Sequence, residues 1–187
     1  MNASPDLFLE KITFDQAIQY TSQLLTTPEL ADEVLESKLV ALLDTMNGAR
    51  GFFVAYLTGS FPQSDAPSAP IYRAIAQAPT VAIDLLVKNI AMSTAMVLTH
   101  CQRGNEDLAK SSALVANRSS RLIRELSENY GAANLIAAAK DLRDSAEGRG
   151  GTYGDFLERW QYDEMQRLAI VTALESACPA IVPDFMA

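Results

Sequence analysis

The sequence predicts an all-α fold, an irregular bundle of about seven to nine helices around one buried central helix. Apolar residues recur along most of the chain with the 3.6-residue period of a helix. Thr, Asp, Asn and Pro stand where helices would start, and Gly and Pro stand where they would end. The 187 residues are 49% hydrophobic and 20% charged, a composition typical of a folded globular chain. We therefore expect residues 1–187 to form a single helical domain.

Two helices are expected before residue 48. The first spans Phe14 to Leu25, with Thr13 as its N-cap. The second opens at Thr27, with Pro28 in the first helical position, and Asn47-Gly48 ends it. Its apolar stripe consists of Leu35, Leu39, Leu42 and Met46.

Residues 48–59, GARGFFVAYLTG, fit either a strand or a buried helix, because Phe, Val and Tyr favour strands. We predict a helix, since the only possible partner strands, residues 8–14 and 180–185, are short. Residues 60–70, SFPQSDAPSAP, are rich in Pro and Ser and predict a loop that could be a hinge between subdomains. Pro70 then starts another helix.

The second half of the chain predicts five further helices. The central one runs from Thr80 to about Gln102 and ends at Gly104, and Asn105 caps the next. The others cover Asn105 to Tyr130, Ala132 to Glu147, Tyr153 to Trp160 and Asp163 to Ala177. Residues 81–98 approach the length of a membrane span, but Asp84, Lys88 and Asn89 interrupt them, so we expect a buried helix and no membrane span.

Charge and cysteine content narrow the class of protein. A net charge of −8 disfavours nucleic acid as a partner, because such binding depends on Lys and Arg that neutralise phosphates. Two cysteines, Cys101 and Cys178, are too few for a disulfide scaffold, and we expect free thiols, at least one of them buried. The N-terminal residues do not resemble a secretory signal, so a cytoplasmic location is expected.

The motifs of metal and nucleophilic chemistry are missing from the sequence. There is one histidine, His100, and Val97 occupies the position where an E-x-x-H motif needs Glu. Neither G-x-S-x-G nor a P-loop occurs, and the glycine run at residues 148–154 suits a turn between two helices. The sequence therefore predicts no catalytic residue, no metal and no cofactor.

Four residues remain as candidate ligand-binding residues: Arg50, His100, Arg118 and Arg121. His100 shares a helix face with Met92 and Met96, which would suit haem or copper, although methionines also fill gaps in cores.

The arginines leave similar alternatives open. Arg118, Arg121 and Arg124 lie on one side of their helix, where they could bind an anion or make ion pairs. Arg50 stands between two glycines near an expected helix N-terminus, a position that suits an anion or close helix packing.

The paired carboxylates are expected on solvated helix faces, because they fall opposite the apolar stripes. They are Asp32, Glu33 and Glu36 on one helix, and Asp141 and Asp144 on another.

Three segments, NGARGFFVAYLTG, AMSTAM and FLERWQYDEMQRLAI, resemble a set of uncharacterised helical proteins of cyanobacteria. The similarity runs over most of the chain. It implies a soluble all-helical protein of photosynthetic bacterial cytoplasm, and it carries over no activity and no catalytic residue.

These observations lead to three hypotheses of function. The first is a non-enzymatic protein that acts through protein–protein interaction or regulation, with another protein or a second copy of itself as partner. The second is a carrier of a small ligand, a tetrapyrrole or an anion in a pocket between helices. The third is an enzyme whose active site is assembled by folding from carboxylates and arginines.

Overall fold

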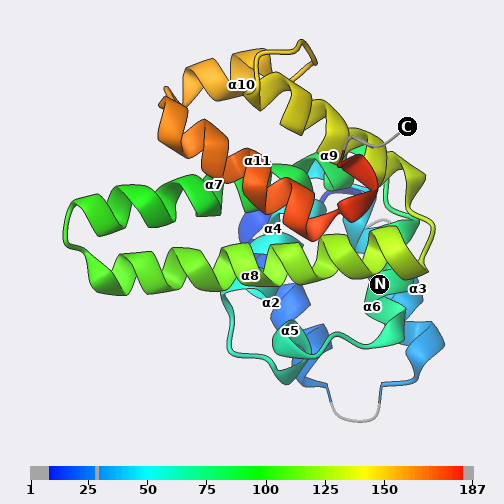
Figure 1. The fold of residues 1–187 in the computed structure, drawn as a ribbon. Helices are drawn as coiled ribbons and strands as arrows, with labels where there is room; N and C mark the ends of the chain where they lie inside the picture. The colour runs from blue at the N-terminus through cyan, green and yellow to red at the C-terminus, as the bar shows by residue number, and fades with distance from the viewer. Residues whose placement is uncertain (1–8, 28–29, 183–187) are drawn as a thin grey trace. The chain divides into compact units, whose positions relative to one another are not determined.

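The computed structural model describes residues 9–27 and 30–182, and this part of the chain is helical without any strand (Figure 1). It holds ten α-helices and one 3-10 helix. The prediction of an all-α fold is confirmed. The chain divides into two compact units, Met1–Leu85 and Leu86–Ala187, and the border between them lies within one long helix. Whether the chain is one domain stays a prediction.

In its described residues, the first unit has five helices from α2 onward that lie before the long helix. They are α2 (Phe14–Thr26), α3 (Asp32–Leu43), α4 (Met46–Thr58), α5 (Pro62–Asp65) and α6 (Ala69–Ala76). Helix α2 packs on α4, and α3 packs on both α4 and α6. The predicted cap of α2 is confirmed, because the Thr13 hydroxyl accepts a hydrogen bond from the Gln16 amide.

The expected second helix is in fact two helices, and the prediction was wrong about its end. Helix α3 ends at Leu43, and Thr45 then caps α4 by accepting a hydrogen bond from the Gly48 amide at 3.1 Å. Met46, placed in the apolar stripe by the sequence, is exposed in the first turn of α4. Residues 48–58 are helical as predicted. The start expected at Pro28 lies outside the described residues, and α3 begins at Asp32.

The segment expected as a loop at residues 60–70 contains the short helix α5 and is tied to α4. The Ser64 hydroxyl donates to the Tyr56 carbonyl at 2.6 Å, and the Tyr56 hydroxyl donates to the Gln63 carbonyl at 2.7 Å. Ser64 is buried. The segment therefore lies inside the first unit, and a hinge there stays a prediction.

The second unit continues from the long helix. Its elements are α7 (Thr80–Gln102), which spans the border, α8 (Glu106–Asn129), α9 (Ala133–Ala146), α10 (Gly154–Arg159), α11 (Glu164–Ala177) and a 3-10 helix (Pro179–Ile181). Helix α11 packs on α8 and α9, and the 3-10 helix lies against α9 and α11. These bounds agree with the predicted ones within one or two residues.

The turns of the second unit explain its hairpins. Gly104 adopts the left-handed conformation, with φ of 70°, and α8 then starts after Asn105, so α7 and α8 form an antiparallel hairpin (Figure 1). Asn105 occupies the N-cap position, but its side chain makes no capping hydrogen bond. The predicted turn at residues 148–154 is confirmed, since Gly148, Gly150 and Gly151 all have positive φ.

Helix α7 changes character along its length. Buried and half-buried side chains alternate from Val81 to Ala95, those of residues 96–100 are half-buried, and Cys101 and Gln102 are exposed. Among the described helices it is the one whose length and composition would allow it to cross a membrane, and 44% of that apolar window is buried. Core helices of soluble proteins meet the same criterion. Part of α7 therefore carries apolar surface that the chain itself does not cover.

Candidate functional site

An apolar groove of about 610 Å³ lies between α7, α8 and α11. Helices α7 and α8 line it with Ile90, Thr94, Leu98, Ala116, Asn117 and Ser120. Helix α11 lines it with Met165, Leu168, Ala169, Thr172, Ala173 and Ser176. None of these side chains is ionisable. The groove therefore offers apolar contact with a few neutral hydrogen-bonding groups.

Helix α11 presents two apolar faces, and only one of them is buried. The core face consists of Ile170, Val171, Leu174 and Ala177. On the groove face, Met165 is 64% exposed and Leu168 is 67% exposed. Two large apolar side chains on one helix turn leave a combined apolar surface in water, and such patches commonly mark binding sites. These two residues are the edge of the groove.

A polar contact holds α11 on α7 at the end of the groove where α11 begins. The Gln166 side chain donates to the Thr99 hydroxyl at 2.9 Å and to the Ala95 carbonyl at 3.4 Å. The same side chain completes a capping box, because its oxygen accepts a hydrogen bond from the Asp163 amide at 3.0 Å. Gln166 thus fixes both the start of α11 and its position on α7.

A second polar contact holds α11 on α8 at the opposite end. Arg124 donates through Nη2 to the Ser176 carbonyl oxygen at 2.6 Å. A guanidinium at the last turn of a helix satisfies a carbonyl that has no partner within the helix, and it also suits the helix dipole. The two contacts fix the ends of α11 and leave the apolar wall between them uncovered.

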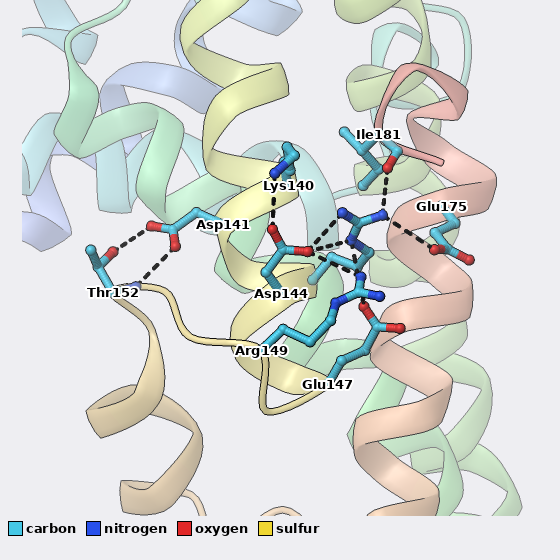
Figure 2. A network of polar contacts seen from close by, with 9 residues as sticks. Lys140, Asp141, Asp144, Glu147, Arg149, Thr152, Glu175 and Ile181 are labelled. Carbon is cyan, nitrogen blue, oxygen red and sulfur yellow. Dashed lines mark hydrogen bonds and ion pairs between the residues drawn. The ribbon is translucent and has the colours of Figure 1, made fainter. Parts of the chain in front are cut away.

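A polar network on the other side of α11 surrounds Arg143, which is 3% exposed. Its guanidinium contacts Asp144 at 2.7 Å and both Glu147 and Glu175 at 3.6 Å. It also donates to the carbonyl of Ile181. Figure 2 shows Glu175 of α11 and Ile181 of the 3-10 helix meeting this network from the side opposite Lys140. The network therefore joins α9 to α11 and to the 3-10 helix.

Asp144 is the acceptor shared by three cations of this network. Burial alone would raise the pKa of its carboxyl, but hydrogen bonds from Lys140, Arg143 and Arg149 outweigh burial and lower that pKa from 3.8 to about 2. Arg149 also pairs with Glu147. Because the Asp144 carboxylate is held ionised by arginine and lysine, the network suits structural support better than proton transfer.

Three carboxylates predicted on solvated faces have polar partners in the structure. Asp144 lies in the network just described, and Asp141 accepts hydrogen bonds from Thr152 (Figure 2). Glu36 contacts Arg73 at 2.6 Å, and that hydrogen bond lowers the pKa of its carboxyl. The prediction placed all three on solvated faces and named none of these partners, because Arg73 comes from α6 and Thr152 from the turn after α9.

The structure places Arg50 and His100 on separate elements. Arg50 lies in the second turn of α4 rather than at its N-terminus, and its guanidinium stacks over the Phe14 ring at 5.2 Å. His100 lies in the last turn of α7, and its Nδ1 is buried without a hydrogen-bond partner among the described residues. Neither lines the groove.

Arg118 and Arg121 lie in the middle of α8, twelve and fifteen residues after its start. Arg118 is buried, whereas Arg121 is exposed. Twelve residues of helix correspond to roughly 18 Å, so Arg118 lies far along α8 from the turn next to which His100 stands. The candidate residues of α7 and α8 are therefore not gathered at one end of the hairpin.

The two thiols are free, as expected, with Cys178 buried and Cys101 exposed. Burial raises the pKa of the Cys178 thiol. Within residues 9–27 and 30–182, no group of three or more His, Cys, Asp or Glu side chains is placed to hold a metal ion.

The fold and the groove define an all-α protein with an apolar groove between α7, α8 and α11 in its second unit. Residues 13–177 match the family model described as Uncharacterised conserved protein UCP020893. Because the match covers most of the chain, the chain belongs to this family. Comparison with curated proteins and with solved structures found no match.

Sequence reasoning missed Met165 and Leu168, although a signal was present. The stretch EMQRLAIVTALESA carries apolar residues on both faces of its helix, whereas a surface helix needs only one such face. A second apolar face on a helix near the surface indicates that something else covers it.

Proposed function

We propose that this chain is a non-enzymatic protein that binds another protein through the apolar groove between α7, α8 and α11. The observation that carries the proposal is the edge of the groove, where Met165 and Leu168 are 64% and 67% exposed. Large exposed apolar side chains beside an apolar groove are typical of a helix-in-groove contact. Polar contacts fix α11 to α7 and to α8 at its two ends, and the groove lies along the helix between them.

Site-specific photocrosslinking tests the proposal. A photoreactive residue in place of Leu168, in cells of the source organism, is expected to capture a protein, either another chain or a second copy of this one. The matched control is Leu108, a leucine of α8 that is 51% exposed and does not line the groove. Adding Met165→Asp to the Leu168 probe should abolish the product. Equal products at Leu168 and Leu108, or none at Leu168, would contradict the proposal.

The cellular setting belongs to the same proposal. The resemblance to cyanobacterial proteins and the two free cysteines support a protein of the cyanobacterial cytoplasm. The net charge of −8 supports a protein partner rather than a nucleic acid. Fractionation of source cells should recover the chain in the cytoplasmic fraction, and a gel-shift assay should show no binding to DNA or RNA.

A small-ligand carrier is the second candidate function. The groove volume of about 610 Å³ lies within the usual range for ligand sites. Its neutral lining suits an apolar ligand, and the candidate anchors Arg50, His100, Arg118 and Arg121 do not line it. Native mass spectrometry of protein taken from its source separates the candidates, because a carrier shows an added mass of ligand and an interaction protein shows the mass of a partner chain.

A further inference from the structure

We propose that the occupant of the groove is a second copy of this chain, with its α11 antiparallel to the first. This inference rests on the proposed function and names its partner. The groove face of α11 has its large side chains, Met165 and Leu168, in its first half. Its small ones, Ala173 and Ser176, lie in the second half.

An antiparallel pair matches large with small side chains at each position. A two-fold axis through the middle of this face sets Met165 of one copy opposite Ser176 of the other, and Leu168 opposite Ala173. A parallel pair would instead set Leu168 against Leu168 and small residues against small ones, leaving gaps. Isologous contacts of this kind need one surface that is complementary to itself, and the groove face of α11 meets that condition.

The charged side chains at the two ends of this face also favour the antiparallel pair, independently of the sizes of the apolar side chains. Glu164 is exposed in the first turn of α11, at one end of the face. Arg124 is exposed at the other end, where its guanidinium reaches the Ser176 carbonyl. The antiparallel pair brings Glu164 of each copy to the end that carries Arg124 of the other, whereas a parallel pair brings like charges together. Complementary charges at the rim of an interface fix its register.

The size of the surface indicates a reversible dimer. From Met165 to Ser176 the face extends about 16 Å. A standard stable interface buries ~800 Å² on each partner, more than one helix of this length provides. We therefore expect an association that depends on concentration, with a dissociation constant in the micromolar range.

Cysteine crosslinking tests the register on a Cys101→Ser background, which removes the exposed native thiol. A mixture of chains carrying L168C with chains carrying A173C should form a disulfide dimer under mild oxidation, and either variant alone should not. A dimer from L168C alone would overturn the antiparallel arrangement.

Sedimentation equilibrium tests the surface and its charges. Leu168→Asp should weaken dimerisation on the order of 100-fold, while Leu108→Asp leaves it unchanged. Glu164→Arg should weaken it about five-fold. Arg124→Glu should weaken it at least as much, because it also removes the hydrogen bond to the Ser176 carbonyl, and adding Glu164→Arg to Arg124→Glu should strengthen dimerisation relative to Arg124→Glu alone. Circular dichroism and thermal unfolding establish that each variant remains folded.

The alternatives have separate outcomes. A strict monomer up to about 100 µM, a concentration that populates even weak dimers, overturns the inference. If the probe at Leu168 then captures a different protein, the proposed function stands. If the probe captures no protein at all, both the proposed function and the inferred dimer are wrong. Binding of the chain to phosphatidylcholine vesicles that is lost with Leu168→Asp, in the absence of a dimer, would overturn both in favour of a membrane surface.

Discussion

The Gln166 side chain donates to the Thr99 hydroxyl at 2.9 Å and so joins the cap of α11 to α7. Gln166→Ala should lower the free energy of unfolding by about 2 kcal/mol, because it removes half of a capping box and a half-buried contact to a second helix. Denaturant unfolding measures the change.

Gln16 provides a matched control for Gln166. It completes the same capping box with Thr13 in α2, and among the described residues its hydrogen bonds stay within that box. Gln16→Ala should cost about 0.5 to 1 kcal/mol. Equal losses for the two variants would mean that the contact with Thr99 adds nothing.

Arg143→Met should be strongly destabilising. The guanidinium is 3% exposed and touches three carboxylates and the Ile181 carbonyl, so its removal leaves Asp144 partly uncompensated and the 3-10 helix without its anchor. The expected loss is about 3 kcal/mol. Lys140→Met is the control, since Lys140 contacts the same carboxylate but its side chain is 59% exposed. It should cost less than about 1 kcal/mol. Urea unfolding tests this, because Arg143→Met should lower the free energy of unfolding more than Lys140→Met does.

Acid sensitivity should depend on Asp144. Its pKa is about 2 in the folded chain and 3.8 as the ordinary value, so the folded state favours the ionised form. The stability from this group is present above the unfolded pKa and is lost as the pH falls from about 4 to about 2. The Asp144→Asn variant should therefore be less stable than the parent chain at neutral pH. Its free energy of unfolding should also change less with pH between about 4 and about 2. Unfolding free energies measured across the window would contradict the assignment if the variant kept the slope of the parent chain.

Many helix ends could be predicted from the residues next to them, whereas the groove could not be predicted from the sequence. Thr13, Gly104 and the glycines near residue 150 mark helix ends through their own backbone chemistry, which needs no knowledge of the partner elements. The stop at Leu43 was missed because Thr45 restarts the helix after only two residues, so the apolar period continues through the break. The groove was missed because it requires knowing that α7, α8 and α11 come together.

The network around Arg143 shows the same division at the level of side chains. Asp144 was correctly placed on a helix opposite the core stripe, but Ile181 and Glu175 reach the network from elements more than thirty residues later in the chain. Spacing on one helix predicts which face a residue occupies. It does not predict which other element packs on that face. Leu168 shows the opposite situation, because it lies on an apolar helix face that is exposed in the structure.

Gly51 should not tolerate a side chain. A Cβ added there would lie 2.4 Å from the Ala17 Cβ and 2.9 Å from the backbone of Ala17 and Ile18, because α4 crosses α2 at this glycine. The neighbours are backbone atoms that cannot rotate away, so Gly51→Ala should force the two helices apart and cost about 1 to 3 kcal/mol. Helix propensity acts in the opposite direction by up to about 1 kcal/mol, which packing strain exceeds.

Gly154 supplies the control for Gly51, because it also lies in a helix and a Cβ added to it meets no atom within 4 Å. Gly154→Ala should be neutral or stabilising by about 0.4 to 1 kcal/mol, since alanine restricts the unfolded chain more than glycine does. Thermal unfolding of the two variants gives opposite signs if the crossing of α2 and α4 is as close as described. A Gly51→Ala variant as stable as the parent chain would show that α2 and α4 can separate at no cost, and the contact at Ala17 would then not hold the first unit together.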